Sequence, residues 1–222
     1  NAAFLSGKKV RYYPLPFGNF NDIARTVRRA RGGEVYGLES RVDGEHFRFA
    51  LCYFTMGMLA ESTEVFDEGK IREKLRKKRG RLYFSLIVLF KWFMKNHKKR
   101  FIPRFRYELD GNRGGVEMAG ISDVMILNGE SMAKLVRGGD YYLNDRFLVR
   151  MASLQNIFTM CWFMIRGFFM GVKGEKASKF KIAFEEEVVG GEVEIQAEGE
   201  YKKLKNVKNI EFKKTKEALQ IL

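Results

Sequence analysis

Alternation of apolar and polar residues with a period of two predicts most of the regular structure in this chain. The alternation is clearest over residues 34–54, on both sides of Asp43-Gly44, a dipeptide that favours a tight hairpin turn. Further strands are expected at 105–109, 116–127, 147–151, 179–184, 192–196, 210–212 and 219–222. Many short strands separated by turn residues favour an antiparallel sheet arrangement.

Two stretches break this alternation and predict helices. Residues 70–100 run from a basic stretch into aromatic and aliphatic residues, and residues 154–170 are almost entirely apolar apart from Arg166. Their most apolar runs, 82–94 and 157–170, are shorter than the about 20 residues that a membrane-spanning helix needs. The expected fold class is therefore α+β, an antiparallel domain with two inserted apolar helices.

The N-terminal segment predicts a strand, a tight turn and a capped helix in succession. Residues 8–13 resemble a strand, and two prolines and Gly18 then force a turn. Asn21 or Asp22 suits the N-cap of a helix that Gly32-Gly33 ends. Such a connection directs backbone N–H groups and a helix N-terminus at one point, which suits phosphate, although a plain connection without a ligand explains it equally well.

Composition excludes several classes of protein. With 45% hydrophobic and 14% aromatic residues, the 222-residue chain can bury a core, which excludes disorder as a description of the whole. Two cysteines and two histidines are too few for a disulfide framework or for most zinc sites. Because no secretion signal is recognisable either, we expect a reducing, intracellular compartment.

The formal net charge of +14 has three explanations. Lys and Arg attract nucleic-acid phosphates and the anionic face of a membrane alike, and a positive solvated surface keeps a protein soluble without any partner. Basic stretches at 74–81 and 96–106 suit nucleic acid by charge and stacking, but core packing explains the aromatic residues between them. Apolar helices with basic flanks also suit membrane contact.

One motif resembles the nucleophile segment of a serine hydrolase. Gly129-Glu130-Ser131-Met132-Ala133 is one residue from a nucleophile elbow, which needs a partner histidine and a strand–turn–helix setting. Because His46 and His97 are the only histidines, serine hydrolysis is not expected.

A run of residues near the N-terminus resembles the diacylglycerol kinase catalytic family of lipid kinases, relatives of the sphingosine kinases and more distantly of the NAD kinases. The family carries Pro-Leu/Ile-Gly-Thr-x-Asn-Asp-Phe-Ala-Arg, and residues 16–25 are similar to it. Gly18, Asn21, Asp22 and Arg25 match, whereas Asn19 replaces the threonine.

Later segments resemble the same family in the same order along the chain. They are the hairpin at 42–47, Asn128 with Ser131-Met132-Ala133, Leu143-Asn144-Asp145 in place of Leu-Asp-Asp-Gly, and Ala197-Glu198-Gly199-Glu200 in place of Val-Asp-Gly-Glu. The order of these motifs supports the resemblance more than any one of them alone.

The resemblance implies transfer of the γ-phosphoryl group of ATP to a lipid hydroxyl, with Mg²⁺ as cofactor. Gly18, Asn19 and Asn21 would cradle phosphate, together with Asp22 and Arg25; a simple helix cap explains Asp22 equally well.

The acidic residues have implied roles as well. Glu198 would be the catalytic base, and Glu200 would orient it or bind metal, unless both belong only to a polar hairpin face. Asn144 and Asp145 are weaker magnesium candidates. Glu198 is one methylene longer than the family's Asp, which puts full activity in doubt. These roles require the bend at Gly18 and the distant acidic pair to meet in one crevice.

The family's Gly-Gly-Asp-Gly-Thr nucleotide loop lies upstream of the first motif and does not occur here. The chain is therefore expected to be a C-terminal portion that is inactive alone. Residues 1–33 would end an α/β nucleotide-binding domain, with 1–3 resembling the remainder of a tag. Residues 34–222 would form a β-sandwich-like lipid-substrate domain, with a return of the last strands to the first domain left open.

The partners implied are a lipid alcohol, an anionic membrane surface and the missing ATP-binding domain in cis, at the inner face of the membrane from the cytoplasm. A homodimer is left open, and nucleic acid is not expected. Phe90, Trp92, Trp162 and Phe169 are candidates for an acyl-chain cleft, with core packing favoured for each. The alternatives are a catalytically decayed lipid- or membrane-binding module, which the replacements at Asn19 and Glu198 favour, and a nucleic-acid-binding protein.

Overall fold

The computed structural model describes most of the chain between Asp22 and the C-terminal strand. The residues described are 22–29, 33–67, 71, 81–96, 102–118, 120–132, 136–154, 156–184 and 192–220. The strand expected at 8–13, the turn at Gly18 and the basic stretch 74–80 lie outside them.

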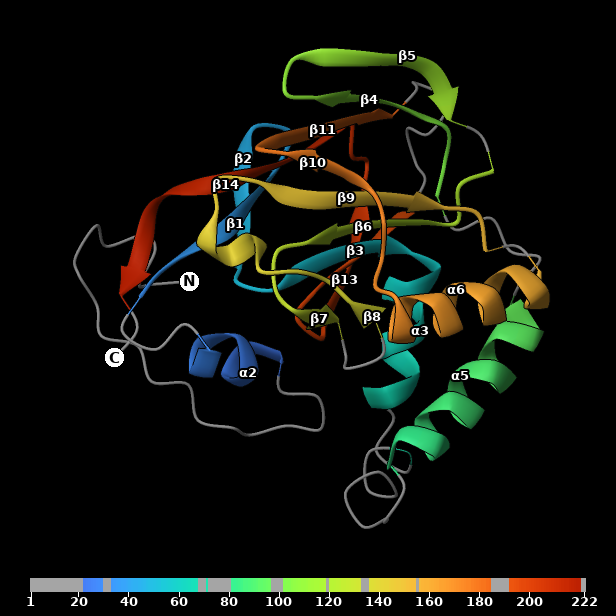
Figure 1. The fold of residues 1–222 in the computed structure, drawn as a ribbon. Coiled ribbons are helices and arrows are strands. Elements are labelled where there is room, and N and C mark those ends of the chain that lie inside the picture. Colours follow the sequence, from blue (N-terminus) through green and yellow to red (C-terminus); the bar gives the residue numbers. More distant parts are fainter. Residues whose placement is uncertain are drawn as a thin grey trace.

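Two six-stranded sheets dominate the molecule, and every pairing between their strands is antiparallel (Figure 1). The first sheet has the order β2 (Glu45–Ala50), β1 (Glu34–Val42), β14 (Asn209–Gln220), β11 (Lys179–Phe184), β4 (Phe105–Leu109) and β5 (Asn112–Met118). The second has the order β10 (Glu175–Ala177), β9 (Phe147–Ala152), β6 (Asp123–Leu127), β3 (Tyr53–Gly57), β12 (Glu192–Ala197) and β13 (Glu200–Lys205). A short hairpin joins β7 (Ser131–Met132) to β8 (Val136–Arg137).

Buried aromatic side chains join the two sheets. Phe54 of β3 and Phe212 of β14 have ring centroids 5.2 Å apart, and Phe180 of β11 stacks on Phe212 at 6.2 Å. All three are fully buried. The alternating apolar residues of strands from both sheets therefore build one core, as expected for a sandwich-like arrangement.

Four helices lie outside the sheets in the described part of the chain: α2 (Asp22–Arg29), α3 (Met58–Asp67), α5 (Arg81–Asn96) and α6 (Ile157–Phe169). A short 3₁₀ helix, η1, covers Tyr141–Leu143. Helix α3 packs against β3, β12, β13 and α5, whereas α6 packs against β8. None of the helices in these stretches is both long and apolar enough to cross a bilayer.

The mixed helix and antiparallel sheet architecture confirms the expected α+β class. Helix α5, at Arg81–Asn96, falls within the expected helical stretch 70–100, and α6 falls within 154–170 but begins at Ile157. Its start follows from a capping box, in which the Asn156 Oδ1 accepts the Thr159 N–H at 2.8 Å. The single strand expected over 116–127 is wrong, because β5 ends at Met118 and β6 begins at Asp123 in the other sheet.

Helix α3 was not predicted from the sequence. It begins directly after β3, where Gly57 has a φ of +91° and a Cβ atom would lie only 2.1 Å from the Ser122 carbonyl oxygen. The Asp123 carboxylate then accepts the Leu59 N–H at 2.7 Å and so caps the first turn of α3. Both contacts involve residues that are distant in the sequence, so a local pattern could not predict where α3 begins.

The expected core packing of the helix aromatics is wrong at three of four positions. Phe90 is 47% exposed, Trp162 63% and Phe169 68%, and only Trp92 packs partly buried against the core.

Candidate functional site

The connection between β2 and β3, at Leu51 and Cys52, brings several of the expected site segments together. Glu198 stands in the turn between β12 and β13, and its Oε1 accepts the N–H groups of both Leu51 and Cys52 at 2.6 Å. On the other side of the connection, the Cys52 carbonyl accepts the N–H groups of Asn128 and Gly129, each at 2.7 Å. The backbone at 51–52 is therefore hydrogen-bonded both to the turn at Glu198 and to the segment at Asn128 and Gly129.

Helix α2 docks onto the same place. The Ser131 hydroxyl donates to the Asp22 Oδ1 at 2.6 Å and accepts from the Arg25 guanidinium at 3.0 Å. One turn further along α2, the Thr26 Oγ1 lies 3.5 Å from the Cys52 Sγ. We call the group formed by Asp22, Cys52, Ser131 and Glu198 the Cys52 corner.

An ion pair extends the docking of α2. The Arg29 guanidinium lies 2.8 Å from the Glu130 carboxylate, next to Ser131. The helix also has an acidic residue in its first turn and basic residues in its last, which suits the helix dipole.

The electrostatics of the Cys52 corner favour proton exchange near neutral pH. Desolvation in this partly buried turn and the charge of Asp22 both raise the pKa of Glu198, and they outweigh the lowering effect of the two backbone N–H groups, so the pKa is about 7. Burial also raises the pKa of the Cys52 thiol, with the charge of Glu198 acting in the same direction. The thiol thus stays protonated, while Glu198 can gain or lose a proton at physiological pH.

Asp22 and Glu198 lie close enough for their charges to interact. The expected meeting of the bend at Gly18 with both acidic residues stays a prediction. Gly18, Asn19 and Asn21, the residues expected to cradle phosphate, lie outside the described residues. Asp22 itself is only 4% exposed and contacts Ser131, and Arg25 contacts the same hydroxyl. This geometry gives both residues a function in docking α2, and their contact with phosphate stays a prediction.

Glu200 does not join Glu198 at the Cys52 corner. Its side chain is 74% exposed, and its carboxylate pairs with the Arg48 guanidinium at 2.5 Å. The hairpin turn explains the separation: Glu198 and Gly199 have φ values of +52° and +95°, so the chain reverses between Glu198 and Glu200, the first residue of β13.

Asn144 and Asp145, the weaker metal candidates, are exposed at the end of η1. The Asn144 amide donates to the Asp140 carbonyl at 3.2 Å, and Asp145 acts electrostatically on the Lys214 ammonium. The described part of the chain holds no cluster of three or more Asp, Glu, His or Cys side chains that could ligate a metal. Asp145 offers a single carboxylate, and Mg²⁺ is usually bound by one or two protein carboxylates together with waters and phosphate oxygens, so metal binding at this place stays a prediction.

Sequence reasoning missed a half-buried lysine near the Cys52 corner. Lys214 of β14 donates to the Asn128 Oδ1 and, at 2.7 Å, to the Tyr141 carbonyl. Burial lowers the pKa of Lys214 to about 7, while the charge of Asp145 opposes the shift. The Asn128 amide in turn donates to the Leu51 carbonyl at 2.6 Å, so Lys214 supports the backbone that holds Glu198.

Cys52 and Ser131 were also missed as site residues. Ser131 stood in a motif that imitated a nucleophile elbow, yet its hydroxyl donates to a carboxylate instead of to a histidine. The one available signal was its position after Asn128 in a motif of the resembled family. Nothing in the sequence marked Cys52, because its role comes from its backbone.

Comparison with known protein families found no match, and comparison with curated proteins found none either. Three solved structures from Bacillus anthracis (strain Sterne), described as diacylglycerol kinases and two of them provisionally, do share the fold. The first has a TM-score of 0.57 at 16% identity and covers 93% of this chain and 66% of its own. The second has a TM-score of 0.52 at 13% identity, covering 93% and 64%. The third has a TM-score of 0.51 at 15% identity, covering 89% and 58%.

The chain spans less than two thirds of the length of each of these structures. It therefore shares the fold of bacterial proteins described as diacylglycerol kinases, which confirms the resemblance of its motifs at the level of the fold.

Proposed function

We propose that this chain is the acceptor-side part of an ATP-dependent kinase that phosphorylates a lipid hydroxyl. The observation that carries the proposal is the meeting of Asp22 and Glu198 at the Cys52 corner, because these residues come from the first and last motifs of the resembled family. The shared fold of structures described as diacylglycerol kinases supports it independently.

Glu198 is the catalytic base of the proposed reaction. Its carboxylate accepts the proton of the lipid hydroxyl while the hydroxyl oxygen forms a bond to the γ-phosphorus of ATP. The bond from that phosphorus to the bridging oxygen breaks, and ADP leaves with the electron pair. Two backbone N–H groups fix the carboxylate, and its pKa of about 7 suits a group that must accept a proton at neutral pH.

The remaining residues position the nucleotide. Gly18, Asn19 and Asn21 bind phosphate in this proposal, and the contacts of Asp22 and Arg25 with Ser131 hold α2 at the Cys52 corner. Mg²⁺, when bound with ATP, would neutralise charge on the phosphates. Since Asn144, Asp145 and Glu200 do not gather into a metal site, we assign no protein ligand to the metal.

The test uses the full-length protein with Mg²⁺, ATP labelled at the γ-phosphate and separate lipid alcohols, including a diacylglycerol and a sphingoid base. We expect a labelled lipid phosphate from at least one of them. If no lipid alcohol becomes labelled while the protein is folded and binds ATP, the proposal is wrong.

A second function, a lipid- or membrane-binding module without catalysis, is favoured by one observation. The Glu198 carboxylate binds two backbone N–H groups, and Glu200 is paired with Arg48, so both acidic residues have structural partners. Binding to vesicles without any phosphorylation of lipid would support this second function.

A further inference from the structure

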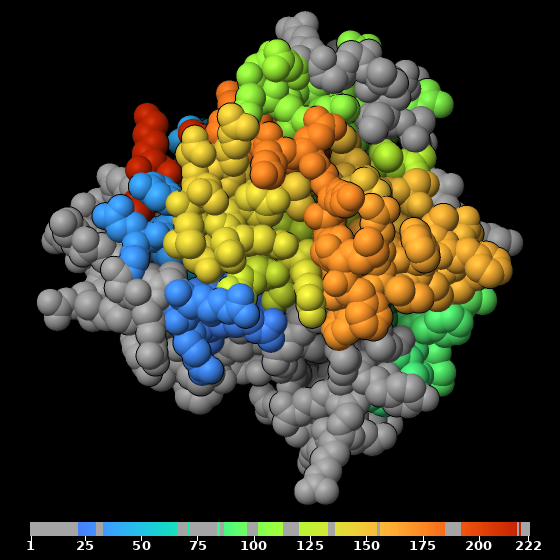
Figure 2. All heavy atoms as spheres, in the orientation of Figure 1, coloured from blue at the N-terminus to red at the C-terminus, as the bar shows by residue number. Residues whose placement is uncertain are grey.

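Helix α6 has two apolar faces, and only one of them is used by the core. Met160, Phe163 and Gly167 are buried. The side chains on the other face are exposed: Phe158 83%, Trp162 63%, Ile165 54% and Phe169 68%. Their spacing of four, three and four residues places them in one row along the helix. Figure 2 shows α6 standing at the right-hand edge of the molecular surface.

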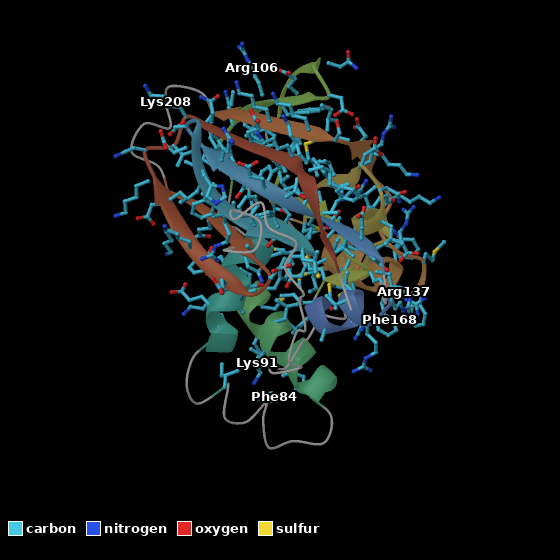
Figure 3. All side chains as sticks on the ribbon, turned by 90° about the vertical axis from the view of Figure 1, so that its left-hand side faces the viewer. Phe84, Lys91, Arg106, Arg137, Phe168 and Lys208 are labelled. Carbon is cyan, nitrogen blue, oxygen red and sulfur yellow. The ribbon has the colours of Figure 1, made fainter. Side chains whose placement is uncertain are left out.

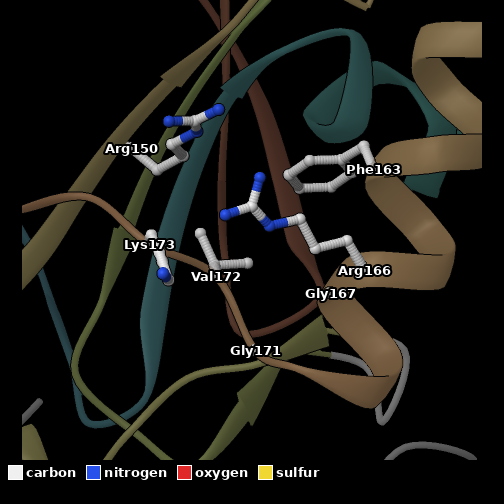
Figure 4. Close-up of a pocket in the computed structure, with 7 residues that line it drawn as sticks. All are labelled: Arg150, Phe163, Arg166, Gly167, Gly171, Val172 and Lys173. Carbon is white, nitrogen blue, oxygen red and sulfur yellow. The ribbon is translucent and has the colours of Figure 1, made fainter.

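A hollow lined by basic side chains lies beside the C-terminal end of α6 (Figure 4). Arg150 of β9, Arg166 of α6 and Lys173 line it, and the two guanidinium groups point into it from opposite sides. None of these three cations forms an ion pair with a carboxylate among the described residues. We call these three residues the basic hollow.

The sequence around α6 has charge of one sign only. Between residues 146 and 174 there is no Asp or Glu, whereas the segment contains Arg146 and the three cations of the basic hollow. An anionic partner is therefore attracted to this segment, although the exposed carboxylates of Asp145 and Glu175 border it and Glu175 pairs with Val149 next to Arg150.

We propose that the exposed row of α6 and the basic hollow together form a surface that docks onto an anionic lipid bilayer. The aromatic and aliphatic side chains enter the boundary between headgroups and acyl chains, where Trp and Phe are favoured. The cations of the basic hollow bind the phosphates of the headgroups. A second copy of the chain fits this surface poorly, because each copy carries a net charge of +14 and the two would repel.

The docking surface is connected to the Cys52 corner through the β7–β8 hairpin. Gly167 of α6 lies against Val136 of β8, and β8 pairs with β7, which contains Ser131. Figure 3 shows Arg137 and Phe168 together on this side of the molecule. A link from the docked membrane to the proposed base rests on the proposed function, whereas membrane binding itself requires no phosphotransfer.

The charge part of the proposal is tested by binding of the full-length protein to vesicles of phosphatidylcholine mixed with phosphatidylglycerol, at about 0.15 M salt. Arg150→Gln/Arg166→Gln should weaken binding about thirtyfold. The matched control is Arg106→Gln/Lys208→Gln, which removes two exposed charges at the far end of the molecule (Figure 3) and should change binding less than threefold. Equal losses in the two variants, or no loss in the first, would contradict a localised surface.

The apolar part is tested by the fluorescence of Trp162 in a Trp92→Phe background. We expect its emission to shift to shorter wavelength on mixed vesicles and not on phosphatidylcholine alone. Trp162→Ala/Phe169→Ala should weaken binding about tenfold, whereas Phe90→Ala/Met94→Ala on α5 should not. An unchanged emission overturns the proposal, and so does self-association that covers Trp162 without vesicles.

Phosphorylation of a water-soluble short-chain acceptor separates this inference from the proposed function. The α6 variants should retain that activity, provided that their thermal unfolding is unchanged. If the short-chain activity is absent in the wild type while vesicle binding follows the pattern above, only the proposed function fails.

Discussion

Three hairpin turns of this molecule have the same construction, and one of them is at the Cys52 corner. Asp43, Asp110 and Glu198 each have φ near +50° and each precede a glycine with φ near +90°. In each turn the carboxylate reaches across to two consecutive backbone N–H groups. The Asp43 Oδ1 accepts from Lys208 and Asn209, the Asp110 Oδ1 from Ser178 and Lys179, and the Glu198 Oε1 from Leu51 and Cys52.

The turns differ in what surrounds the carboxylate. At Asp110 the weak burial is outweighed by hydrogen bonds from Ser178 and Lys179, so its pKa is lowered. At Glu198 burial prevails over similar hydrogen bonds, and the charge of Asp22 adds to it, so its pKa rises to about 7. A turn whose carboxylate elsewhere only accepts backbone N–H groups becomes a candidate for proton transfer where it is partly buried and lies near the charge of Asp22 of α2.

The largest expected effect is the loss of turnover when the charge of Glu198 is removed. Glu198→Gln keeps the shape and an oxygen acceptor for the two N–H groups but cannot accept a proton. Phosphorylation of lipid alcohol by the full-length protein should fall at least about a hundredfold, as for loss of a general base. The matched change at the exposed turn, Asp110→Asn, should leave turnover unchanged. Full turnover in Glu198→Gln would exclude it as the base.

The pH dependence of stability should also separate the two turns. A carboxyl whose pKa is about 7 in the folded protein and 4.5 in the unfolded chain binds more protons when folded between these values. Its contribution is present below pH 4.5 and is lost as pH rises through 7, by at most about 3 kcal/mol.

The measurement is the free energy of unfolding, by denaturant titration, of wild type and Glu198→Gln from pH 4 to 8. Because buried Asp123 also has a raised pKa of about 7, the difference between the two proteins is the informative quantity. The wild type should lose stability relative to the variant as pH rises. A constant difference would show that Glu198 has an ordinary pKa.

The effect of α2 on Glu198 is tested by removing the Ser131 hydroxyl, which hydrogen-bonds to Asp22 of this helix. Ser131→Ala removes the donor to the buried Asp22 carboxylate and should cost about 2 kcal/mol of unfolding free energy. Looser docking of α2 should also lower the pKa of Glu198 towards its usual range and move the acid limb of the activity profile to lower pH. Ser178→Ala is the matched control, since its hydroxyl donates to Asp110 at 2.8 Å on an exposed surface. Equal costs in the two variants would contradict the role of burial.

The turns at Asp43 and Asp110 could be predicted from the sequence. The different surroundings of Glu198 in the third turn could not. Asp43-Gly44 and Asp110-Gly111 are local hairpin signals, and β1–β2 and β4–β5 do meet there. Strand β13 was missed, so the turn at Glu198-Gly199 was known only through the resemblance to a family. Its surroundings include Asp22 and Cys52, more than a hundred residues away in the sequence, and a local pattern of apolar and polar residues does not predict such contacts.

The same reasoning applies to the helices. The period of α6 predicted a helix, but an apolar face that meets the core and one that meets solvent have the same sequence pattern. Trp162 and Phe169 were therefore assigned to the core, and only the packing of α6 on β8 shows which face is covered.

The smallest expected effect is at the exposed turn, where Asp110→Asn should cost less than about 1 kcal/mol of unfolding free energy at pH 7. An asparagine oxygen still accepts the Ser178 and Lys179 N–H groups, and solvent screens the lost charge. Because the pKa of Asp110 is lowered from 3.8, its charge stabilises the fold above that value, and the contribution is lost as pH falls below it. Denaturant titrations at pH 7 and pH 3 should therefore show a small difference that shrinks in acid. A cost as large as that of Ser131→Ala would mean that the turns at Asp110 and Glu198 are energetically alike, and that the nearby α2 does not distinguish Glu198.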